Sequence, residues 1–216
     1  YYDQKELKNI LYSENEIFNI PFSVESFFSQ DKNKIFSELN LDLMKIKIKN
    51  ELIFENERKR GNSLLTLNKE KRIFDYQIEK NFFNFHMLDK ADKPNTIFKG
   101  KFNFKPFFSN IEGNLNEINL NYLLGSNAII AELLKTEIFN NKNIDFKLNI
   151  KADNVYGNSN FRNINLNSKI QEGLIDTDNT KFEWKDIADF ELLESLIFVK
   201  NGELILDGKL LINITD

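Results

Sequence analysis

The chain contains one histidine, His86, and no cysteine. Histidine is the side chain most often used as a general base or metal ligand near neutral pH, so His86 is the first candidate for chemistry. It lies in the stretch NFFNFHML, at the phase opposite to Phe83, Phe85 and Met87. In a β-strand that spacing places His86 on the face away from the three apolar side chains. We therefore interpret His86 as a solvent-facing strand residue, and the sequence predicts neither a metal site nor a cofactor.

Several acidic residues have types and spacings that are used in binding or catalysis. The stretch DTDN, residues 176–179, begins like a calcium loop, but the central glycine and the distal glutamate of such a loop are absent at the required spacing. Glu55 with Glu57, and Glu191 with Glu194, would suit the paired carboxylates of a glycoside hydrolase. Nothing in the sequence brings two of them together, and charged strand ends explain all four. A phosphate-binding glycine loop and a nucleophile elbow are also missing, so we predict that the chain is not an enzyme.

The basic run Arg58-Lys59-Arg60 precedes Gly61. It would suit either contact with anionic lipid headgroups or a solvated hairpin tip, and we interpret it as the tip, with the turn in ERKRGN. The net charge of −4 gives no electrostatic signature of a nucleic-acid partner. Since no run of about 18 apolar residues occurs, this segment is not predicted to span a membrane.

The elements that would position any site are read from the alternation of apolar and polar residues. In NIDFKLNIKA, residues 143–152, every second residue is apolar, and the residues between them are Asp145, Lys147, Asn149 and Lys151. Strict alternation is typical of a β-strand with one apolar and one wet face. The pattern recurs along the chain, which is 41% hydrophobic and 29% charged, so a folded, mainly β chain is predicted.

Two local patterns refine this prediction. Apolar residues at spacings of three and four predict one α-helix around residues 127–139. The pair Asn201-Gly202 between two apolar runs predicts a two-residue hairpin, in which Val199 pairs with Leu204 and Ile197 with Leu206 on one side of the sheet. A change of phase near Met44 predicts a bulge or a bend. We treat residues 1–216 as one elongated module, with a seam near residues 106–110.

The order of these parts resembles the AsmA-like family, particularly its YhdP and DUF3971 branch. From Asn119 onward the matching stretches are LNYLL, the predicted helix, NIDFKLNIKADNVYG, FRNINLNSKIQEGLIDTDNTKFEW and NGELILDGKLLINITD. In the first half, IPFSVESFF and FKGKFNFKPFF are similar more loosely. The resemblance covers most of the chain and consists of patterns of periodicity. No catalytic residue is carried over from it.

The resemblance implies a fold and a function. AsmA-like proteins are anchored in the inner membrane of Gram-negative bacteria, and their periplasmic sheet curls into a groove implicated in moving phospholipids toward the outer membrane. We therefore expect a long twisted antiparallel sheet curled into an open, β-taco or solenoid-like groove, with the helix of residues 127–139 capping or plugging it. The chain would be a periplasmic fragment of a longer protein whose other parts reach both membranes. Its partners would be phospholipid acyl chains, and no nucleic acid is expected.

The predicted groove needs bulky apolar side chains on its inner face. A seven-residue strand is about 23 Å long, and half the hydrocarbon thickness of a bilayer is about 15 Å, so such strands are wide enough to fold around acyl chains. The residues predicted to line the groove are Phe102, Phe104, Ile144, Phe146, Leu148, Ile150, Ile164, Leu166, Ile170, Ile197, Val199, Leu204, Leu206, Leu210 and Ile212.

Two other functions fit the same alternation. A structural β-sandwich or solenoid module of the cell envelope would cover its apolar faces with protein. A carbohydrate-binding or carbohydrate-acting β-protein would place exposed aromatic residues on a polar face, whereas Trp184 is the only tryptophan and most of the 21 phenylalanines lie in the apolar phase.

Overall fold

The computed structural model describes residues 2–3, 8–17, 20–30, 33–55, 58–67, 70–90, 93–120, 143–171, 174–200 and 203–215. Nearly all of these residues lie in β-strands, so the predicted mainly β fold class is confirmed. The chain divides into two compact units, Tyr1–Lys101 and Phe102–Asp216, which we call the N-terminal and C-terminal units. The predicted seam at residues 106–110 lies inside the C-terminal unit, and the single module stays a prediction.

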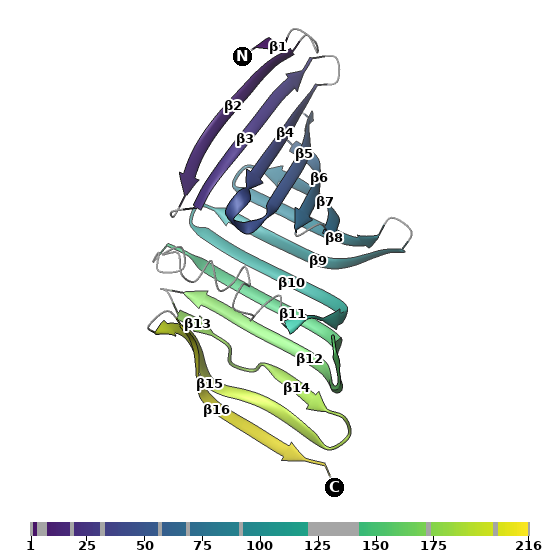
Figure 1. The fold of residues 1–216 in the computed structure, drawn as a ribbon, viewed down its shortest axis with the longest axis vertical. Helices are drawn as coiled ribbons and strands as arrows, with labels where there is room; N and C mark the ends of the chain where they lie inside the picture. The colour runs from purple at the N-terminus through teal and green to yellow at the C-terminus, as the bar shows by residue number, and fades with distance from the viewer. Residues whose placement is uncertain are drawn as a thin grey trace. The chain divides into compact units, whose positions relative to one another are not determined.

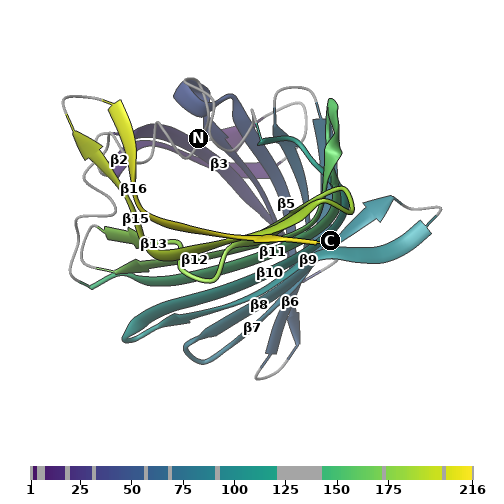
Figure 2. The ribbon, with the colours of Figure 1, turned by 90° about the horizontal axis from the view of Figure 1, so that it is seen from below.

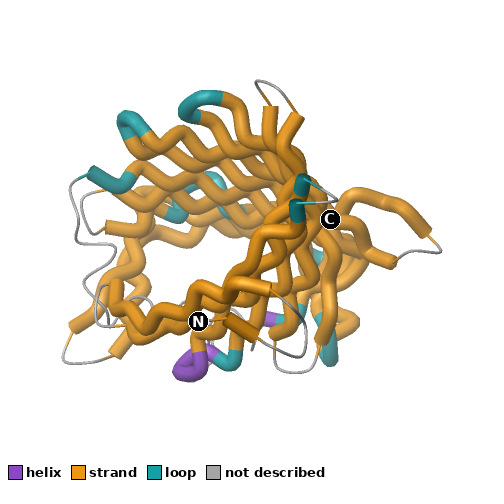
Figure 3. Tube along the Cα trace, turned by 90° about the horizontal axis from the view of Figure 1, so that it is seen from above, coloured by secondary structure: helices purple, strands orange, loops and turns teal. Residues whose placement is uncertain are grey.

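The N-terminal unit is a sheet in which strands adjacent in sequence pair with each other (Figure 1). Every consecutive pair from β1 to β8 is antiparallel. The sheet is strongly twisted, as Figures 2 and 3 show. Its strands are β1 (Tyr2–Asp3), β2 (Lys8–Ile17), β3 (Ile20–Ser29), β4 (Lys34–Leu41), β5 (Ile46–Glu55), β6 (Arg58–Leu67), β7 (Glu70–Glu79), β8 (Phe82–Lys90) and most of β9 (Lys93–Phe104).

Two connections of this unit differ in detail from the sequence prediction. The change of phase near Met44 is a bend: a short 3₁₀ helix, Asp42–Met44, joins β4 to β5 and ends at Lys45, which has a φ of 54°. The turn predicted in ERKRGN is wrong, because β6 already begins at Arg58 and Gly61 pairs with Leu52 inside the ladder. Ion pairs and close packing support these residues as strand, as described below.

The C-terminal unit contains one parallel pair in an otherwise antiparallel sheet, which agrees with the predicted, mainly antiparallel sheet. β10 runs parallel to β11, with Ile111 opposite Leu148 and Gly113 opposite Ile150. Parallel neighbours need a long crossover, which residues 119–144 provide. The helix predicted at residues 127–139 falls in this crossover and outside the described residues. The strands of this unit are β10 (Phe107–Ile118), β11 (Asp145–Val155), β12 (Asn158–Gln171), β13 (Leu174–Asp176), β14 (Lys181–Trp184), β15 (Ala188–Lys200) and β16 (Glu203–Ile214).

The register of the last two strands is the predicted one. Val199 pairs with Leu204 and Ile197 with Leu206. The predicted Asn201-Gly202 turn lies outside the described residues. A β-bulge interrupts β15 between Leu193 and Leu196.

The bulge in β15 is held by the residues of the DTDN stretch. The Ser195 backbone N–H donates to Asp178 Oδ1 at 2.6 Å, and Thr177 Oγ1 donates to Ser195 Oγ at 2.9 Å. Asp176 Oδ1 accepts the N–H of Asp178 at 2.8 Å. On β16, a Cβ at Gly208 would lie 2.7 Å from Ser195 Cα, so only glycine allows this close approach of the two strands.

Candidate functional site

The two faces of the N-terminal sheet differ sharply in chemistry. The registers of β2 to β8 place alternate residues on the same face, and one face carries most of the large apolar side chains. We call it the N-terminal apolar face, and its members include Phe22, Val24, Phe28, Ile35, Leu39, Ile46, Ile48, Leu52, Leu65, Leu67, Phe74, Tyr76, Ile78, Phe83, Phe85 and Met87. The other face holds a smaller apolar set, which includes Ile10, Phe27, Phe36, Ile53, Leu64, Ile73 and Leu88.

The opposite face of this unit carries cross-strand ion pairs. Examples join Arg58 Nε to Glu79 at 3.1 Å and Arg60 Nε to Glu55 at 3.4 Å. Glu38 on β4 pairs with Lys47 on β5, and the hydrogen bond from Lys47 holds the pKa of Glu38 below its usual value. Other ion pairs on this face join Lys34 to Glu51 and Lys49 to Glu38. We call this the solvated face, although Phe27 and Phe36 stack on it with ring centroids 5.1 Å apart.

Aromatic rings cover part of the N-terminal apolar face. Tyr76 and Phe83 stack with ring centroids 5.1 Å apart, and Phe74 meets Phe85 edge to face at 6.2 Å. The Tyr76 ring crosses β6 directly over Gly61, where a Cβ would lie 2.1 Å from the ring. Glycine at position 61 therefore makes room for the tyrosine to reach β5.

A row of polar residues crosses the N-terminal apolar face. Ser26, Ser37, Asn50 and Ser63 occupy directly paired positions on β3, β4, β5 and β6. Asn50 Nδ2 donates to Ser37 Oγ at 3.1 Å, and Asn50 Oδ1 accepts from Ser63 Oγ at 2.8 Å and from Tyr76 Oη at 2.5 Å. We call these four residues the polar row. Sequence analysis missed it, although a polar residue at the apolar phase of four successive strands was a readable signal.

A hollow of about 450 Å³ lies where the polar row begins. Four of its lining residues, Leu11, Ser26, Phe28 and Ile35, belong to the N-terminal apolar face by register. Asn9, Ile10 and Phe27 complete its lining. The lining therefore combines large apolar side chains with few polar groups, and its Leu11 and Phe28 are open to solvent.

The C-terminal unit also has one apolar face. Phe146 pairs with Ile170, Ile150 with Leu166, and β13 continues the row because Ile175 pairs with both Ile170 and Ile197. We call this the C-terminal apolar face. It includes Ser109, Ile111, Phe146, Leu148, Ile150, Ala152, Ile164, Leu166, Ile170, Ile175, Ile197, Leu206, Leu210 and Ile212.

The residues predicted to line a groove fall largely on this face. The strand registers bring together those from Phe146 to Ile170, and those of β15 and β16 follow through Ile197 and Leu206. For Val199 and Leu204 the structure gives only that they pair with each other across β15 and β16. Phe102 on β9 lies beside Phe107 of β10, with ring centroids 6.4 Å apart, whereas Phe104 is exposed and Ile144 precedes β11. Whether these residues contact lipid stays a prediction.

Burial varies strongly across the C-terminal apolar face. At its centre Ile150 is 3% exposed, and Ile164 and Ile170 are also buried. On β16, Leu206 is 54% exposed and Ile212 is 50% exposed. Large apolar side chains on one continuous face are thus partly covered and partly open to solvent.

An aromatic cluster lies beside the exposed part of this face. Phe182 and Phe190 stack with centroids 4.9 Å apart, and Phe161 and Trp184 pack against them. By register Trp184 shares the C-terminal apolar face with Phe182, Phe190 and Ile212, whereas the carbohydrate alternative called for aromatic residues on a polar face.

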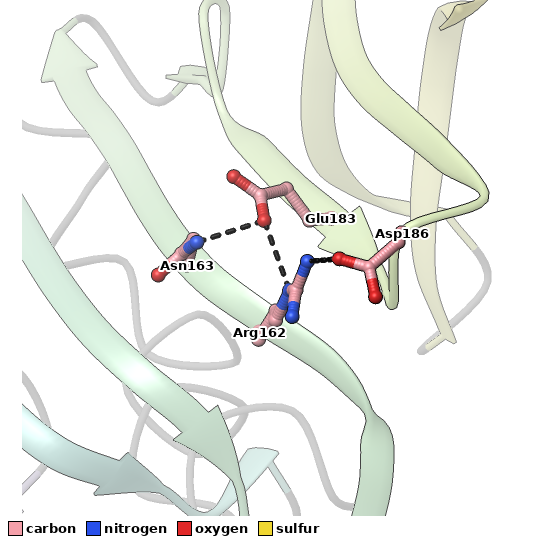
Figure 4. Close-up of polar contacts among 4 residues, drawn as sticks. All are labelled: Arg162, Asn163, Glu183 and Asp186. Carbon is pink, nitrogen blue, oxygen red and sulfur yellow. Dashed lines mark hydrogen bonds and ion pairs between the residues drawn. The ribbon is translucent and has the colours of Figure 1, made fainter. Parts of the chain in front are cut away.

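Figure 4 shows how the β14 strand that carries Phe182 and Trp184 is held. Arg162 Nε donates to Glu183 Oε2 at 3.1 Å, and its terminal nitrogen pairs with Asp186. Asn163, at a φ of 51°, donates from Nδ2 to the same Glu183 oxygen at 2.7 Å. The hydrogen bond to Asp186 raises the pKa of Arg162 further above its usual value. These contacts fix β14 to β12 at a register shift in the β12 ladder.

The wet face of the C-terminal unit is rich in amides. Asn149 Nδ2 donates to Asn165 Oδ1 at 3.1 Å and also to Asn167, whose own Nδ2 donates to the Asn179 carbonyl at 2.7 Å. A shallow polar hollow of about 270 Å³ lies over this network. It is lined by Asn110, Lys147, Leu148, Asn149, Asn167, Ser168, Lys169, Asp176, Asp178 and Asn179.

The residues first considered for chemistry have structural partners. His86 is on the solvated face as predicted, with Nε2 3.8 Å from Asp75. Glu191 pairs with Lys181 at 3.1 Å, Glu194 pairs with Lys209, and Glu57 lies outside the described residues. Across the described ranges no three metal-ligating side chains come together. Within the same ranges no helix is long and apolar enough to cross a bilayer.

Comparisons with models of protein families, with curated proteins and with solved structures gave no match for this chain. The resemblance to the AsmA-like family therefore rests on the sequence pattern alone.

Proposed function

We propose that the chain is a lipid-shielding segment of an AsmA-like bridge protein, which covers phospholipid acyl chains as they pass between the inner and outer membranes. It would act in the periplasm, anchored by a part of the protein outside this chain. No chemical step is involved, because the task is to keep hydrocarbon away from water. At about 25 cal/mol for each Å² of apolar surface, even one acyl chain gains substantially from such cover.

The observation that carries this proposal is the division of each unit into an apolar face and a charged or amide-rich face. On the C-terminal apolar face, the in-phase positions of β11 and β12 from Phe146 to Ala152 and from Ile164 to Ile170 hold apolar residues and one serine. Exposed apolar side chains on β16 extend this face. Soluble proteins rarely leave a large contiguous apolar surface uncovered, so an apolar ligand is the natural occupant.

One observation favours a second candidate, a structural envelope module with a protein-covered core. Ile150, Ala152, Ile164 and Ile170 are all buried, as the residues of an ordinary core would be. The two functions differ in whether folded protein carries lipid.

The test is to produce the protein in the periplasm of a Gram-negative bacterium and analyse it by native mass spectrometry. We expect co-purifying phospholipid, since the apolar faces would take it from the membrane. Folded protein that carries no lipid and binds none from added vesicles would contradict the proposal and favour the structural module.

A matched pair of variants locates the lipid. Phe146→Glu places a carboxylate on the C-terminal apolar face, where desolvation opposes it or raises its pKa. Lys147→Glu changes charge one residue away on the wet face, where Lys147 is exposed. Lipid carried per folded molecule should fall sharply in the first variant and stay near the wild-type level in the second. Equal lipid content in both folded variants would show that position 146 does not line the lipid path. If Phe146→Glu leaves no folded population, the covered core is favoured.

A further inference from the structure

The polar row on the N-terminal apolar face ends, at Ser26 and Ser37, in hydroxyl hydrogens that have no acceptor among the described residues. Ser37 Oγ accepts a hydrogen bond from Asn50 Nδ2. The hydroxyl hydrogen of Ser37 is therefore available to donate to another group. Among the described residues, Ser26 Oγ has no hydrogen-bond partner. At the other end of the row, Ser63 and Tyr76 both donate to Asn50 and are satisfied. The hydroxyls on β6 and β7 therefore donate within the row, whereas those on β3 and β4 have no acceptor among the described residues.

The two open hydroxyls are neighbours. Ser26 and Ser37 are directly paired across β3 and β4, and such pairs have Cβ atoms about 5 Å apart. A single carbonyl oxygen has two lone pairs and can accept from two donors at that spacing. Leu11, Phe28 and Ile35 surround Ser26 in the hollow of about 450 Å³.

We propose that this hollow seats the acyl ester of a neutral or zwitterionic glycerolipid, with the ester carbonyl on the Ser26 and Ser37 hydroxyls and the adjoining alkyl chain on Leu11, Phe28 and Ile35. The inference rests on the proposed function and names the part of the lipid that is recognised. An ester is favoured over a free carboxylate because none of the residues lining the hollow is charged. A carboxylate brought there without a cation would lose its solvation.

The polar row also has a consequence for movement of the ligand. A uniform apolar face offers an acyl chain no preferred position along its length. A pair of hydroxyl donors at one place gives the ester one preferred position there, held by at most two neutral hydrogen bonds, which is weak enough to release. The site would therefore act as a resting position for the lipid on this unit.

The experiment compares two photoreactive lipids that differ in one group. The probes are 1-monooleoylglycerol and its 1-O-oleyl ether analogue, each with a diazirine at the same carbon of the chain. After illumination of the full chain, trypsin releases residues 9–32 as one peptide, because the sequence has no Lys or Arg between Asn9 and Asp31. This peptide contains Leu11, Ser26 and Phe28, so its labelling reports the hollow.

We expect the ester probe to label peptide 9–32 at least about two- to tenfold more than the ether probe, the range for one neutral hydrogen bond, and more if both hydroxyls donate. Ser26→Ala should reduce ester labelling toward the ether level, because only the Ser37 donor remains, and should leave ether labelling unchanged. Ser29→Ala, on the same strand but on the opposite face, should behave as wild type. Unfolding curves should be the same for wild type and Ser26→Ala, which excludes loss of fold as the cause.

Three other outcomes have distinct meanings. Equal labelling of peptide 9–32 by both probes, with no effect of Ser26→Ala, would overturn the ester seat while leaving lipid shielding intact. Labelling confined to peptides other than 9–32 would overturn the hollow as a site. No labelling of any peptide by either probe would remove the proposed function and this inference with it.

Discussion

The two apolar faces share one sequence pattern and differ in how they treat polar groups. On the N-terminal apolar face, Asn50 joins Ser37, Ser63 and Tyr76 in one hydrogen-bonded row. On the C-terminal apolar face, Ser109 is fully buried and its Oγ has no hydrogen-bond partner among the described residues. A polar side chain on an apolar face can thus be a connected part of the fold or an isolated, unfavourable group. Neighbouring strands decide which, and those neighbours are set by register.

The faces also differ in burial. The centre of the C-terminal face contains Ile150, Ile164 and Ile170, all buried. Equivalent alternating residues of the N-terminal face, such as Ile48 and Leu52, are half-buried. The same alternation therefore buries the aliphatic residues at the centre of one face, whereas on the other the aliphatic residues of β5 are half-buried and Tyr76 is buried.

The largest effect should come from placing a charge on each face. Ile150→Glu buries a carboxylate and should destabilise the C-terminal unit by more than about 4 kcal/mol. Ile48→Glu, in a similar alternating sequence but half-buried, should cost about 1–3 kcal/mol because water reaches the carboxylate. Hydrogen–deuterium exchange of the strands of each unit measures both. If both variants lose the same amount of protection, the two positions are equally buried in solution, which would contradict the proposed difference.

Removing the centre of the polar row should have the next largest effect. Asn50→Ala leaves the Ser63 and Tyr76 hydroxyls, both in buried residues, without their acceptor, and should cost about 1–3 kcal/mol. Asn62→Ala is the matched control, because exposed Asn62 bonds to Asp75 on the solvated face at 2.7 Å. Its effect should stay within about 0.5 kcal/mol. Urea unfolding measures both variants, and equal effects would mean that the row adds no stability.

Two serine substitutions should have opposite signs. Ser63→Ala removes a bonded hydroxyl and should lower the free energy of unfolding by about 1 kcal/mol. Ser109→Ala removes a buried hydroxyl that has no partner among the described residues, and should raise it by a few tenths to about 1 kcal/mol. Thermal and urea unfolding of the two variants give the signs directly. A destabilising Ser109→Ala would show that its hydroxyl is satisfied in solution.

The smallest effect concerns pH. Burial raises the pKa of Tyr76 above the ordinary value of 10.0, and the hydrogen bond with Asn50 only partly offsets this. The unfolded state therefore loses this proton first as pH rises, so the contribution of Tyr76 to stability is complete below about pH 10 and decreases above it. The free energy of unfolding of wild type should fall more steeply between about pH 9 and about pH 11 than that of Tyr76→Phe. Parallel curves for the two proteins would argue against a buried hydroxyl at position 76.

Much of the local structure could be predicted from the sequence. Alternation identified the strand and the faces of residues 145–152, and the Asn-Gly pair gave the Val199–Leu204 register, because side-chain period and turn chemistry are local properties. The turn in ERKRGN was placed wrongly because a charged run resembles a loop. In the folded chain, those charges pair across strands with Glu55 and Glu79.

What the sequence determined by itself is which side chains share a face, since that depends only on the two-residue repeat of a strand. The tertiary structure decided which strands become neighbours. It placed β10 parallel to β11, brought Asn50 between Ser37 and Ser63, and laid Tyr76 over Gly61. It also decided which apolar residues are covered, leaving Ile150 buried and Ile212 exposed. These outcomes depend on contacts between residues far apart in the chain, which a local pattern does not encode.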